Sequence, residues 1–367
     1  MFKITMLIHN ILSKRIDFKV WIILGFLSNM FMIGVLCFNI FIDPYLLFSH
    51  NTRFNILSYG SNERQEKTNR IYFNNNKDYN AILLGSSRAT FVNQYEFKGM
   101  RLYNYAVSSM MPFEYKFYID FMKQSLNKDL DYIILQIDFF GSNVPSEKIL
   151  KEQDPVQFIN TTTQPFYRLR AYFSLQTFKK YSLVVLKESL GFTQPFYHSY
   201  YFRNNVKIRK KATEEQRAKD FNFHLKRHTK ELSDSYYKFN ENLIMILQTI
   251  KQENKNSQFI VYTSPITANL LASIIRNANR WEEYKQWLKM HIEVFGSVWQ
   301  FMGINSITTN LNNYPDDDHL YPEICTLMAH KITNYQIDKI PQDFGILLTK
   351  DNIDEYLENL ADEIAKY

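Results

Sequence analysis

The sequence predicts an α/β protein with a parallel sheet, anchored by one N-terminal transmembrane helix. Short apolar runs at residues 81–84, 102–107, 132–137 and 259–263 each end in polar residues, as buried parallel strands do. Stretches with apolar residues at helical spacing separate several of these runs. Strand, helix and strand in this order are typical of a parallel sheet with crossover helices. A long uncharged segment precedes them all.

The uncharged segment extends from Val20 to Ile42. A transmembrane helix needs about 20 mostly apolar residues, so this segment is long enough; a buried core helix is the alternative. A cleaved signal peptide would have a shorter apolar region and a small-residue cleavage site, and neither is present. Residues 1–19 carry four basic residues and one acid. The positive-inside rule therefore predicts a cytoplasmic basic tail over 1–19 and an extracytoplasmic main domain.

The composition leaves the broad class open but excludes some functions. A chain of 367 residues can hold one large domain or two ordinary ones, and 46% hydrophobic residues suffice for a core. The net charge of +6 is mild and spread along the chain, so we expect no nucleic acid partner. Cys37 lies in the apolar segment and Cys325 near the C-terminus, so we expect no disulfide between them.

The remaining chain divides into three parts. Residues 43–77 predict an irregular polar connector, and the α/β domain covers 78–335. Within it, residues 145–235 are rich in aromatic and basic side chains and predict a largely helical insertion. The basic face of this insertion is either merely solvated or binds anionic lipid headgroups, an acidic glycan or a partner. Residues 336–367 form a C-terminal extension that ends in an acidic amphipathic helix over 348–366.

Further helices complete the α/β pattern. Pro112 stands at the start of a predicted helix over 113–125, since proline suits the first helical position. The other expected elements are helices over 236–253 and 281–295, a helix from Pro322, and a short strand over 299–304.

A tight turn with two hydroxyls follows the first strand. Gly85 lets the backbone turn without a Cβ penalty, and Ser86, Ser87 and Arg88 come next. In open α/β sheets, ligands and chemistry collect at the carboxyl ends of the strands. A serine at this turn is a candidate nucleophile if a histidine base can reach it.

The far end of the chain offers that base in Asp316-Asp317-Asp318-His319. An Asp-x-x-His unit before a helix can place the carboxylate on one imidazole nitrogen and leave the other facing a nucleophile. This assigns Ser87 as nucleophile, His319 as base and Asp316 as the residue that orients the ring. Asp317 and Asp318 fit less well because they are too close to His319 in sequence. The alternatives are a solvated loop or a loose cation site; with no further ligand cluster, we predict no metal and no cofactor.

Four stretches, ILLGSSR, NYAVSS, YIILQIDFF and YPDDDHLYPE, together resemble the block order of the SGNH/GDSL hydrolase superfamily. More narrowly, the chain resembles membrane-anchored bacterial members with GSSR in the first block, whose relatives include alginate O-acetylation proteins and the D-alanine transfer protein of lipoteichoic acid synthesis. Other stretches that look familiar from this group are Asp43-Pro44-Tyr45, Ser264-Pro265 and Asp343-Phe344-Gly345. The resemblance implies a flavodoxin-like three-layer α/β/α domain. It also implies that Ser87 is the nucleophile and that Asp316 and His319 complete the triad.

Two positions depart from the pattern of this superfamily. Ser109 stands where the second block supplies a glycine amide to the oxyanion hole, and a serine amide can donate equally well if its backbone angles permit. Asp138 stands where the third block supplies an Asn side chain, and an ionised carboxylate would oppose a developing oxyanion. Either Asp138 is protonated or turned away, or another residue donates, or catalysis is weak; it can also simply cap a nearby turn. Ser109, Asp138 and Arg88 are therefore the candidate oxyanion or substrate-binding residues.

The resemblance implies acyl-ester chemistry on a cell-envelope glycan. We expect a serine acyltransferase in the bacterial inner membrane that transfers an acyl group, most simply acetyl, to a polysaccharide. Such transferases usually depend on a multipass membrane acyltransferase, which is the expected partner. An acyl-esterase of the same fold and a catalytically silent protein that binds glycan or a partner through residues 145–235 are the alternatives.

Overall fold

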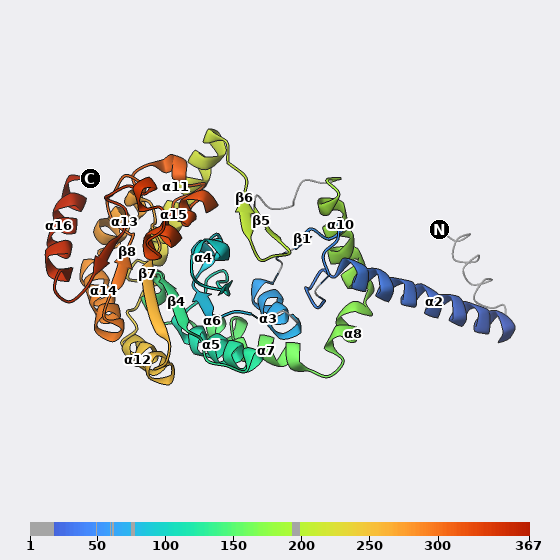
Figure 1. The fold of residues 1–367 in the computed structure, drawn as a ribbon. Coiled ribbons are helices and arrows are strands. Elements are labelled where there is room, and N and C mark those ends of the chain that lie inside the picture. The colour runs from blue at the N-terminus through green and yellow to red at the C-terminus, as the bar shows by residue number, and fades with distance from the viewer. Residues whose placement is uncertain (1–17, 49, 59, 61, 75–77, 193–198) are drawn as a thin grey trace.

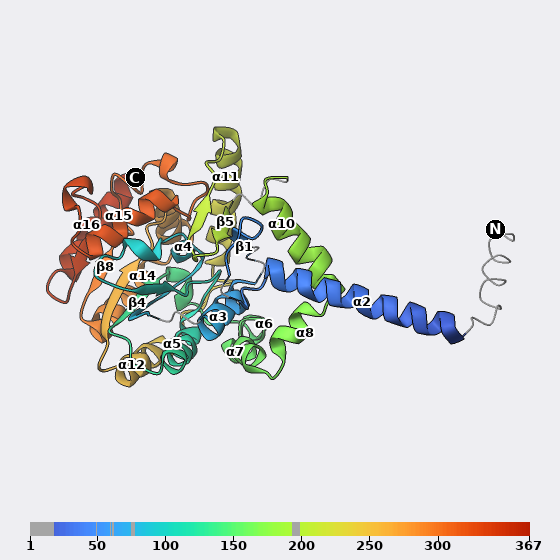
Figure 2. The same ribbon diagram turned by 45° about the vertical axis from the view of Figure 1, so that its right-hand side comes forward.

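The structure is a computed structural model that describes residues 18–48, 50–58, 60, 62–74, 78–192 and 199–367. An α/β domain is joined to one long helix that projects away from it in both views (Figures 1 and 2). Of the basic tail predicted over 1–19, residues 1–17 lie outside the described residues.

The domain is organised around a six-stranded sheet with the order β3-β2-β4-β7-β8-β9. Its strands are β2 (Ala81–Leu84), β3 (Leu102–Asn104), β4 (Tyr132–Ile137), β7 (Gln258–Thr263), β8 (Val298–Gln300) and β9 (Ile346–Leu348). The first five pair in parallel, and β9 adds an antiparallel edge. The mostly parallel sheet confirms the predicted α/β class. All four residues of β2 are buried, which explains its unbroken apolar run.

Helices cover both faces of the sheet. Successive strand residues point to opposite faces, and accordingly Ile82 and Leu84 belong to one core while Ala81 and Leu83 belong to the other. The first core is completed by α5 (Pro112–Leu126), α12 (Leu243–Glu253), α14 (Trp281–Phe295) and α16 (Ile353–Lys366). The second core is completed mainly by α15 (Pro322–Ile332) and the short α4 (Ser87–Thr90).

Several predicted boundaries were displaced. The helix expected over 348–366 begins at Ile353, because Leu348 pairs with Val298 as the last residue of β9. The helix expected over 236–253 begins only at Leu243. The predicted helix over 281–295 matches α14 at both ends.

The projecting helix α2 (Phe18–Ile42) contains the predicted membrane segment. At about 1.5 Å per residue, its 25 residues span roughly 37 Å, more than the ~30 Å hydrocarbon core of a bilayer. Only 6% of its most apolar window is buried against the protein, so it is not a core helix. Its length and composition fit a single membrane span or a signal sequence.

The expected irregular connector contains ordered elements. Helix α3 (Glu63–Phe73) is capped by Asn62, whose side chain accepts from the Gln65 amide, and strand β1 (Leu57–Ser58) precedes it. Strand β1 pairs with β5 (Ser199–Phe202), which forms a hairpin with β6 (Lys207–Arg209). The connector therefore belongs to a second, three-stranded sheet beside the main one.

The insertion over 145–235 is mainly helical and also contributes the β5–β6 hairpin. Its helices are α6 (Glu147–Glu152), α7 (Pro155–Thr163), α8 (Tyr167–Tyr172), α9 (Leu175–Thr177), a π-helix (Phe178–Ser182), α10 (Leu183–Ser189) and α11 (Glu214–Glu231). The middle of the insertion packs against the end of α2, where the Asn39 side chain donates to the Tyr172 carbonyl at 2.8 Å. Its last helix reaches the other end of the domain (Figure 1).

Candidate active site

The candidate nucleophile lies on a turn whose shape is dictated by its neighbours. Strand β2 ends at Leu84, and a Cβ on Gly85 would lie 2.5 Å from Gln136 Oε1 and 2.9 Å from the Ala89 Cβ. Only glycine fits there without displacing Gln136 or Ala89. The Gln136 side chain also accepts from the Ser86 amide at 3.0 Å, and the Ser86 hydroxyl accepts from the Arg88 amide at 3.3 Å. The turn therefore presents Ser87 at the carboxyl edge of the sheet.

The structure brings His319 to Ser87 from the other end of the chain. His319 Nε2 lies 2.8 Å from Ser87 Oγ, although the two residues are separated by 232 positions. His319 follows β8 in a loop that ends at α15, so the serine and the histidine both lie beyond the carboxyl ends of parallel strands.

Two carboxylates face the opposite nitrogen of the imidazole. Asp316 lies 3.1 and 3.2 Å from His319 Nδ1 through its two oxygens, as predicted for the orienting residue. Asp318 Oδ1 comes even closer, at 2.7 Å, but without hydrogen-bond alignment. Sequence proximity suggested that Asp318 could not turn back. It does so because the amides of Asp318 and His319 both donate to Asp316 Oδ1, which folds the loop onto itself.

This pair of carboxylates sets the charge of the imidazole. Burial disfavours the charged ring, but Asp318 and Asp316 outweigh it and raise the pKa of His319 to about 10. At neutral pH, His319 Nε2 therefore carries a proton and donates it to Ser87 Oγ. The ring must lose this proton before it can act as a general base.

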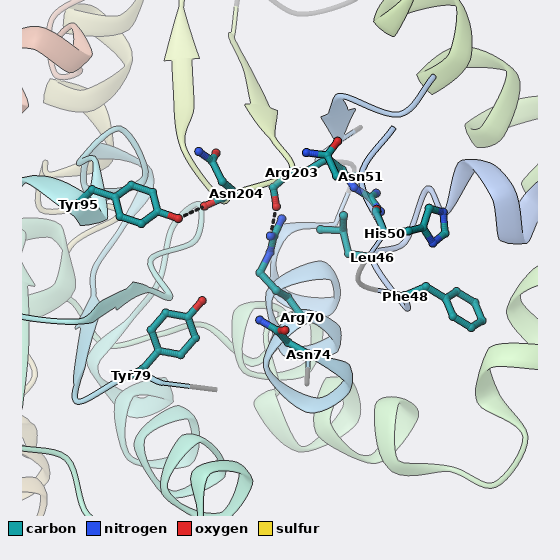
Figure 3. A pocket seen from close by; sticks show the side chains of 10 residues that line it. All are labelled: Leu46, Phe48, His50, Asn51, Arg70, Asn74, Tyr79, Tyr95, Arg203 and Asn204. Carbon is teal, nitrogen blue, oxygen red and sulfur yellow. Dashed lines mark hydrogen bonds between the residues drawn. The ribbon is translucent and has the colours of Figure 1, made fainter. Parts of the chain in front are cut away.

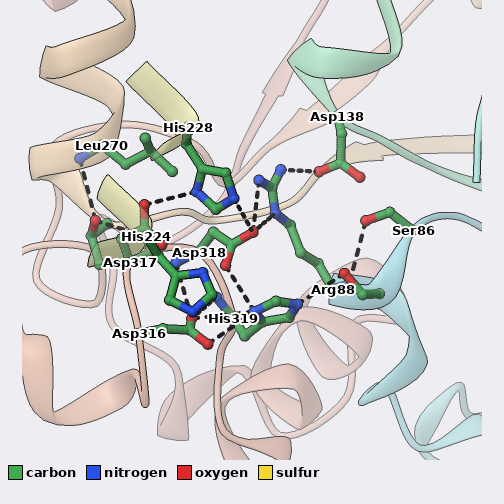
Figure 4. Close-up of polar contacts among 12 residues, drawn as sticks. Ser86, Arg88, Asp138, His224, His228, Leu270, Asp316, Asp317, Asp318 and His319 are labelled. Atoms are coloured by element: carbon green, nitrogen blue, oxygen red, sulfur yellow. Dashed lines mark hydrogen bonds and ion pairs between the residues drawn. The ribbon is translucent and has the colours of Figure 1, made fainter. Parts of the chain in front are cut away.

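Arg88 connects the two ends of the site (Figure 4). Its guanidinium forms ion pairs with Asp318, at 3.0 Å, and with Asp138, and its side chain is only 9% exposed. Burial opposes the charge, yet these two carboxylates raise the pKa of Arg88 above its ordinary value. Asp138 makes no capping hydrogen bond to the 3₁₀ turn that follows it, so the turn-capping alternative does not apply. Its carboxylate is instead balanced by Arg88.

Ser109 lies at the mouth of the same site in an unusual backbone conformation. Its φ of 54° falls in the left-handed region that favours glycine. Ser109, Ser87 and His319 line a cavity of about 590 Å³, within the usual range for small-molecule sites. Phe139, Phe140 and other apolar side chains form much of its wall.

The insertion contributes residues that sequence reasoning did not connect with the site. His228 of α11 lines the cavity, and its Nδ1 lies 2.9 Å from Asp317 Oδ2. Arg209 of β6 pairs with Asp316 Oδ2 at 3.2 Å. The abundance of basic residues in the insertion was visible, but only the fold pairs them with the three acids before His319.

The described residues include two groups of His and Asp that could hold a cation: His224, His228 and Asp317, and Asp316, Asp318 and His319. The first group is already occupied by a side chain of the protein, because Arg227 Nη2 lies 3.0 Å from His224 Nδ1 and 2.9 Å from His228 Nε2. A metal would have to displace this guanidinium. In the second group, the His319 Nε2 that faces away from the acids is directed at Ser87.

No protein-family model matches the chain, and a search of curated proteins found no match either. The interpretation of the site therefore depends on its own geometry and charge.

Proposed function

We propose that the protein is a membrane-anchored serine acyltransferase of the SGNH/GDSL type, which transfers an acyl group, most simply acetyl, to a cell-envelope polysaccharide. The observation that carries the proposal is the 2.8 Å contact between Ser87 Oγ and His319 Nε2, with Asp316 on the opposite ring nitrogen. A hydroxyl, an imidazole and a carboxylate in this order are the parts of a nucleophilic triad, which is recognised by geometry rather than by sequence order.

The proposed reaction has two halves. Ser87 Oγ attacks the donor carbonyl while neutral His319 takes the hydroxyl proton, and that proton then goes to the leaving group as the bond to the acyl carbon breaks. In the second half, His319 removes a proton from a sugar hydroxyl, which attacks the acyl-serine. The acyl–Oγ bond breaks, Oγ takes the proton back, and the new ester leaves. Asp316 holds the ring in the required tautomer throughout.

The developing oxyanion needs donors that are already in place. The proposed donor is the backbone amide of Ser109, which the positive φ turns in the way that a glycine at this position would. Asp138 would otherwise repel the oxyanion, but its charge is balanced by Arg88. Arg88 thus has an electrostatic positioning role in this proposal.

The proposed place of action follows from the resemblance of the sequence to membrane-anchored SGNH/GDSL proteins. The chain would cross the bacterial inner membrane once through α2, with a cytoplasmic N-terminus and a periplasmic or extracellular domain. The donor would reach Ser87 from a multipass membrane acyltransferase, and the acceptor would be an envelope glycan.

Two other functions could use this site. If water reaches the acyl-serine before a sugar does, the same residues make the protein a carbohydrate acyl-esterase. One observation favours a catalytically silent glycan- or partner-binding protein instead: the Asp316 and Asp318 carboxylates both lie beside His319 Nδ1 and favour the charged ring, which leaves little neutral base at pH 7.

The test compares the full-length protein with Ser87→Ala and with a matched control, Ser235→Ala, whose serine is exposed on a turn. Each protein is incubated with p-nitrophenyl acetate at pH 7 and pH 9, and the intact mass is measured. We expect one acetyl adduct, or turnover, in the wild type and the control, and neither in Ser87→Ala. Absence of any difference between the wild type and Ser87→Ala would exclude Ser87 as the nucleophile.

A further inference from the structure

A second cavity lies beside the end of α2 (Figure 3). It has a volume of about 240 Å³ and is lined by residues of the connector, of α3 and of the β5–β6 hairpin. This volume is several times the roughly 10–15 Å³ that one water requires, but smaller than most sites for drug-sized ligands. The cavity therefore suits a small group.

The cavity contains a cation, Arg70, that forms no ion pair within the part of the chain that the structure describes. Arg70 Nη1 donates to the Arg203 carbonyl, whereas Arg70 Nε is buried and has no hydrogen-bond partner among the described residues. Burial lowers the pKa of Arg70, and the carboxylate among the main influences on it, on Glu66, offsets this only weakly. The Glu66 carboxylate instead accepts from the Ser58 hydroxyl at 3.0 Å. Of the residues that are not described, only Asp17, which precedes α2 in the sequence, is acidic.

The other lining groups are basic or polar. Arg203 also faces the cavity, but its charge is already balanced by the buried Asp43. Asn51, Asn204 and the Tyr79 hydroxyl supply further groups able to donate hydrogen bonds, whereas the Tyr95 hydroxyl already donates to the Asn204 carbonyl. Among the described residues, no acidic one lines the cavity. An unpaired guanidinium surrounded by donors is the arrangement that recognises an oxyanion.

The position of the cavity indicates where its ligand comes from. Leu46, Phe48 and His50 follow Ile42, the last residue of α2, and the His50 ring lies 2.8 Å from the Phe41 carbonyl. If α2 spans a bilayer, this cavity lies where the chain leaves the hydrocarbon core. The phosphate headgroups of a bilayer lie at that depth.

We propose that this cavity binds a phosphate group, presented either by an anionic phospholipid headgroup or by free phosphate. Arg70, which lines the cavity, would supply the charge, and the Asn51 and Asn204 side chains and the Tyr79 hydroxyl would complete the hydrogen bonding. The inference does not depend on the acyl transfer proposed above, since the cavity shares no lining residue with the Ser87 cavity.

The test uses the full-length protein and three variants. Asn204→Asp places a negative charge at the rim of the cavity while keeping the oxygen that accepts from the Val206 amide at 3.2 Å. Arg70→Gln removes the unpaired charge. Arg276→Gln removes an exposed arginine on the far side of the sheet domain and is the matched control.

Two arms distinguish the sources of phosphate. In detergent, inorganic phosphate is titrated by calorimetry. In nanodiscs of phosphatidylcholine with or without phosphatidylglycerol, native mass spectrometry counts the lipids that the protein retains. We expect Asn204→Asp and Arg70→Gln to weaken binding of phosphate or of phosphatidylglycerol about tenfold or more, in whichever arm the wild type binds its ligand. Arg276→Gln should leave this binding unchanged.

Retention of phosphatidylglycerol alone would assign the site to a lipid headgroup, and binding of inorganic phosphate alone would assign it to a soluble anion. Either result supports the proposal if the variants respond as expected. If Arg70→Gln fails to fold by thermal melting, Asn204→Asp decides. Binding that is equal in Asn204→Asp and the wild type, or no binding in either arm, would overturn it.

Discussion

The sharpest prediction concerns Asp318, the second carboxylate beside the imidazole. The difference between a pKa of about 10 and the ordinary 6.5 for His319 corresponds to ~5 kcal/mol in favour of the charged ring, at about 1.4 kcal/mol per pKa unit. Asp318 is the largest source of this stabilisation and Asp316 the next. Removal of one neighbouring opposite charge typically moves a pKa by about 1–3 units. In Asp318→Asn, the pKa of His319 should fall by this amount.

The consequence is an increase in activity from the loss of an active-site charge. Because neutral imidazole is the base, each unit by which the pKa falls raises the neutral fraction at pH 7 about tenfold; acylation of Ser87 should speed up by less than this, since a base of lower pKa takes the proton less readily. The assay follows p-nitrophenol release from p-nitrophenyl acetate between pH 6 and 10.5. Asp316→Asn should instead slow the reaction, since the amide can donate to Nδ1 and hold the ring in the tautomer that cannot accept the serine proton.

Asp317→Asn is the control, because Asp317 pairs with His228 and is not among the main influences on His319. The midpoint of its pH–rate profile should match that of the wild type. If the midpoint of the pH–rate profile of Asp318→Asn stays at the wild-type value, this account of the charge on His319 is refuted.

Three further predictions concern stability. Gly85→Ala should destabilise the protein by about 1–3 kcal/mol, seen as a lower melting temperature, because the new Cβ would meet Gln136 at 2.5 Å; an unchanged melting temperature would contradict the close packing of this turn. Asp43→Asn should lower the free energy of unfolding by about 3–5 kcal/mol, because it leaves the buried Arg203 without its ion pair. Asp78→Asn, at an exposed pair with Arg101, should lower it by less than about 1 kcal/mol. Because the pKa of His319 is raised, its charged ring stabilises the fold fully below pH 6.5, and this stabilisation is lost as the pH rises towards 10. The melting temperatures of the wild type and His319→Gln should therefore converge over this range, and a constant difference between them would contradict the prediction.

Much of the sheet domain could be predicted because its signals are local. The runs at 81–84 and 132–137 are buried strands with the predicted bounds, since strands covered on both faces show unbroken apolar sequence. The edge strand β9 was missed because only three residues, Ile346–Leu348, form it and two of them are exposed. A short edge strand carries too little apolar pattern to be distinguished from the start of the following helix.

The candidate site was predictable in part. Its main residues are separated by more than two hundred positions, but the rule that chemistry collects at the carboxyl edge brings Ser87 and His319 together. The partners of Asp316 and Asp317, namely Arg209 and His228, were not predictable, since they depend on how the insertion returns to the loop. The ion pair between Arg88 and Asp138 was likewise not predictable, since it depends on the folded structure.

The most direct measurement labels the full-length protein with a fluorophosphonate, which reacts with activated serines, and maps the modified residue by peptide fragmentation. Ser86 and Ser87 are adjacent, so fragmentation must separate them. We predict a single label on Ser87 that is faster at pH 9 than at pH 7 and is lost in His319→Gln. A label on another serine, or none at pH 9, would contradict the assignment of Ser87 as a nucleophile activated by His319.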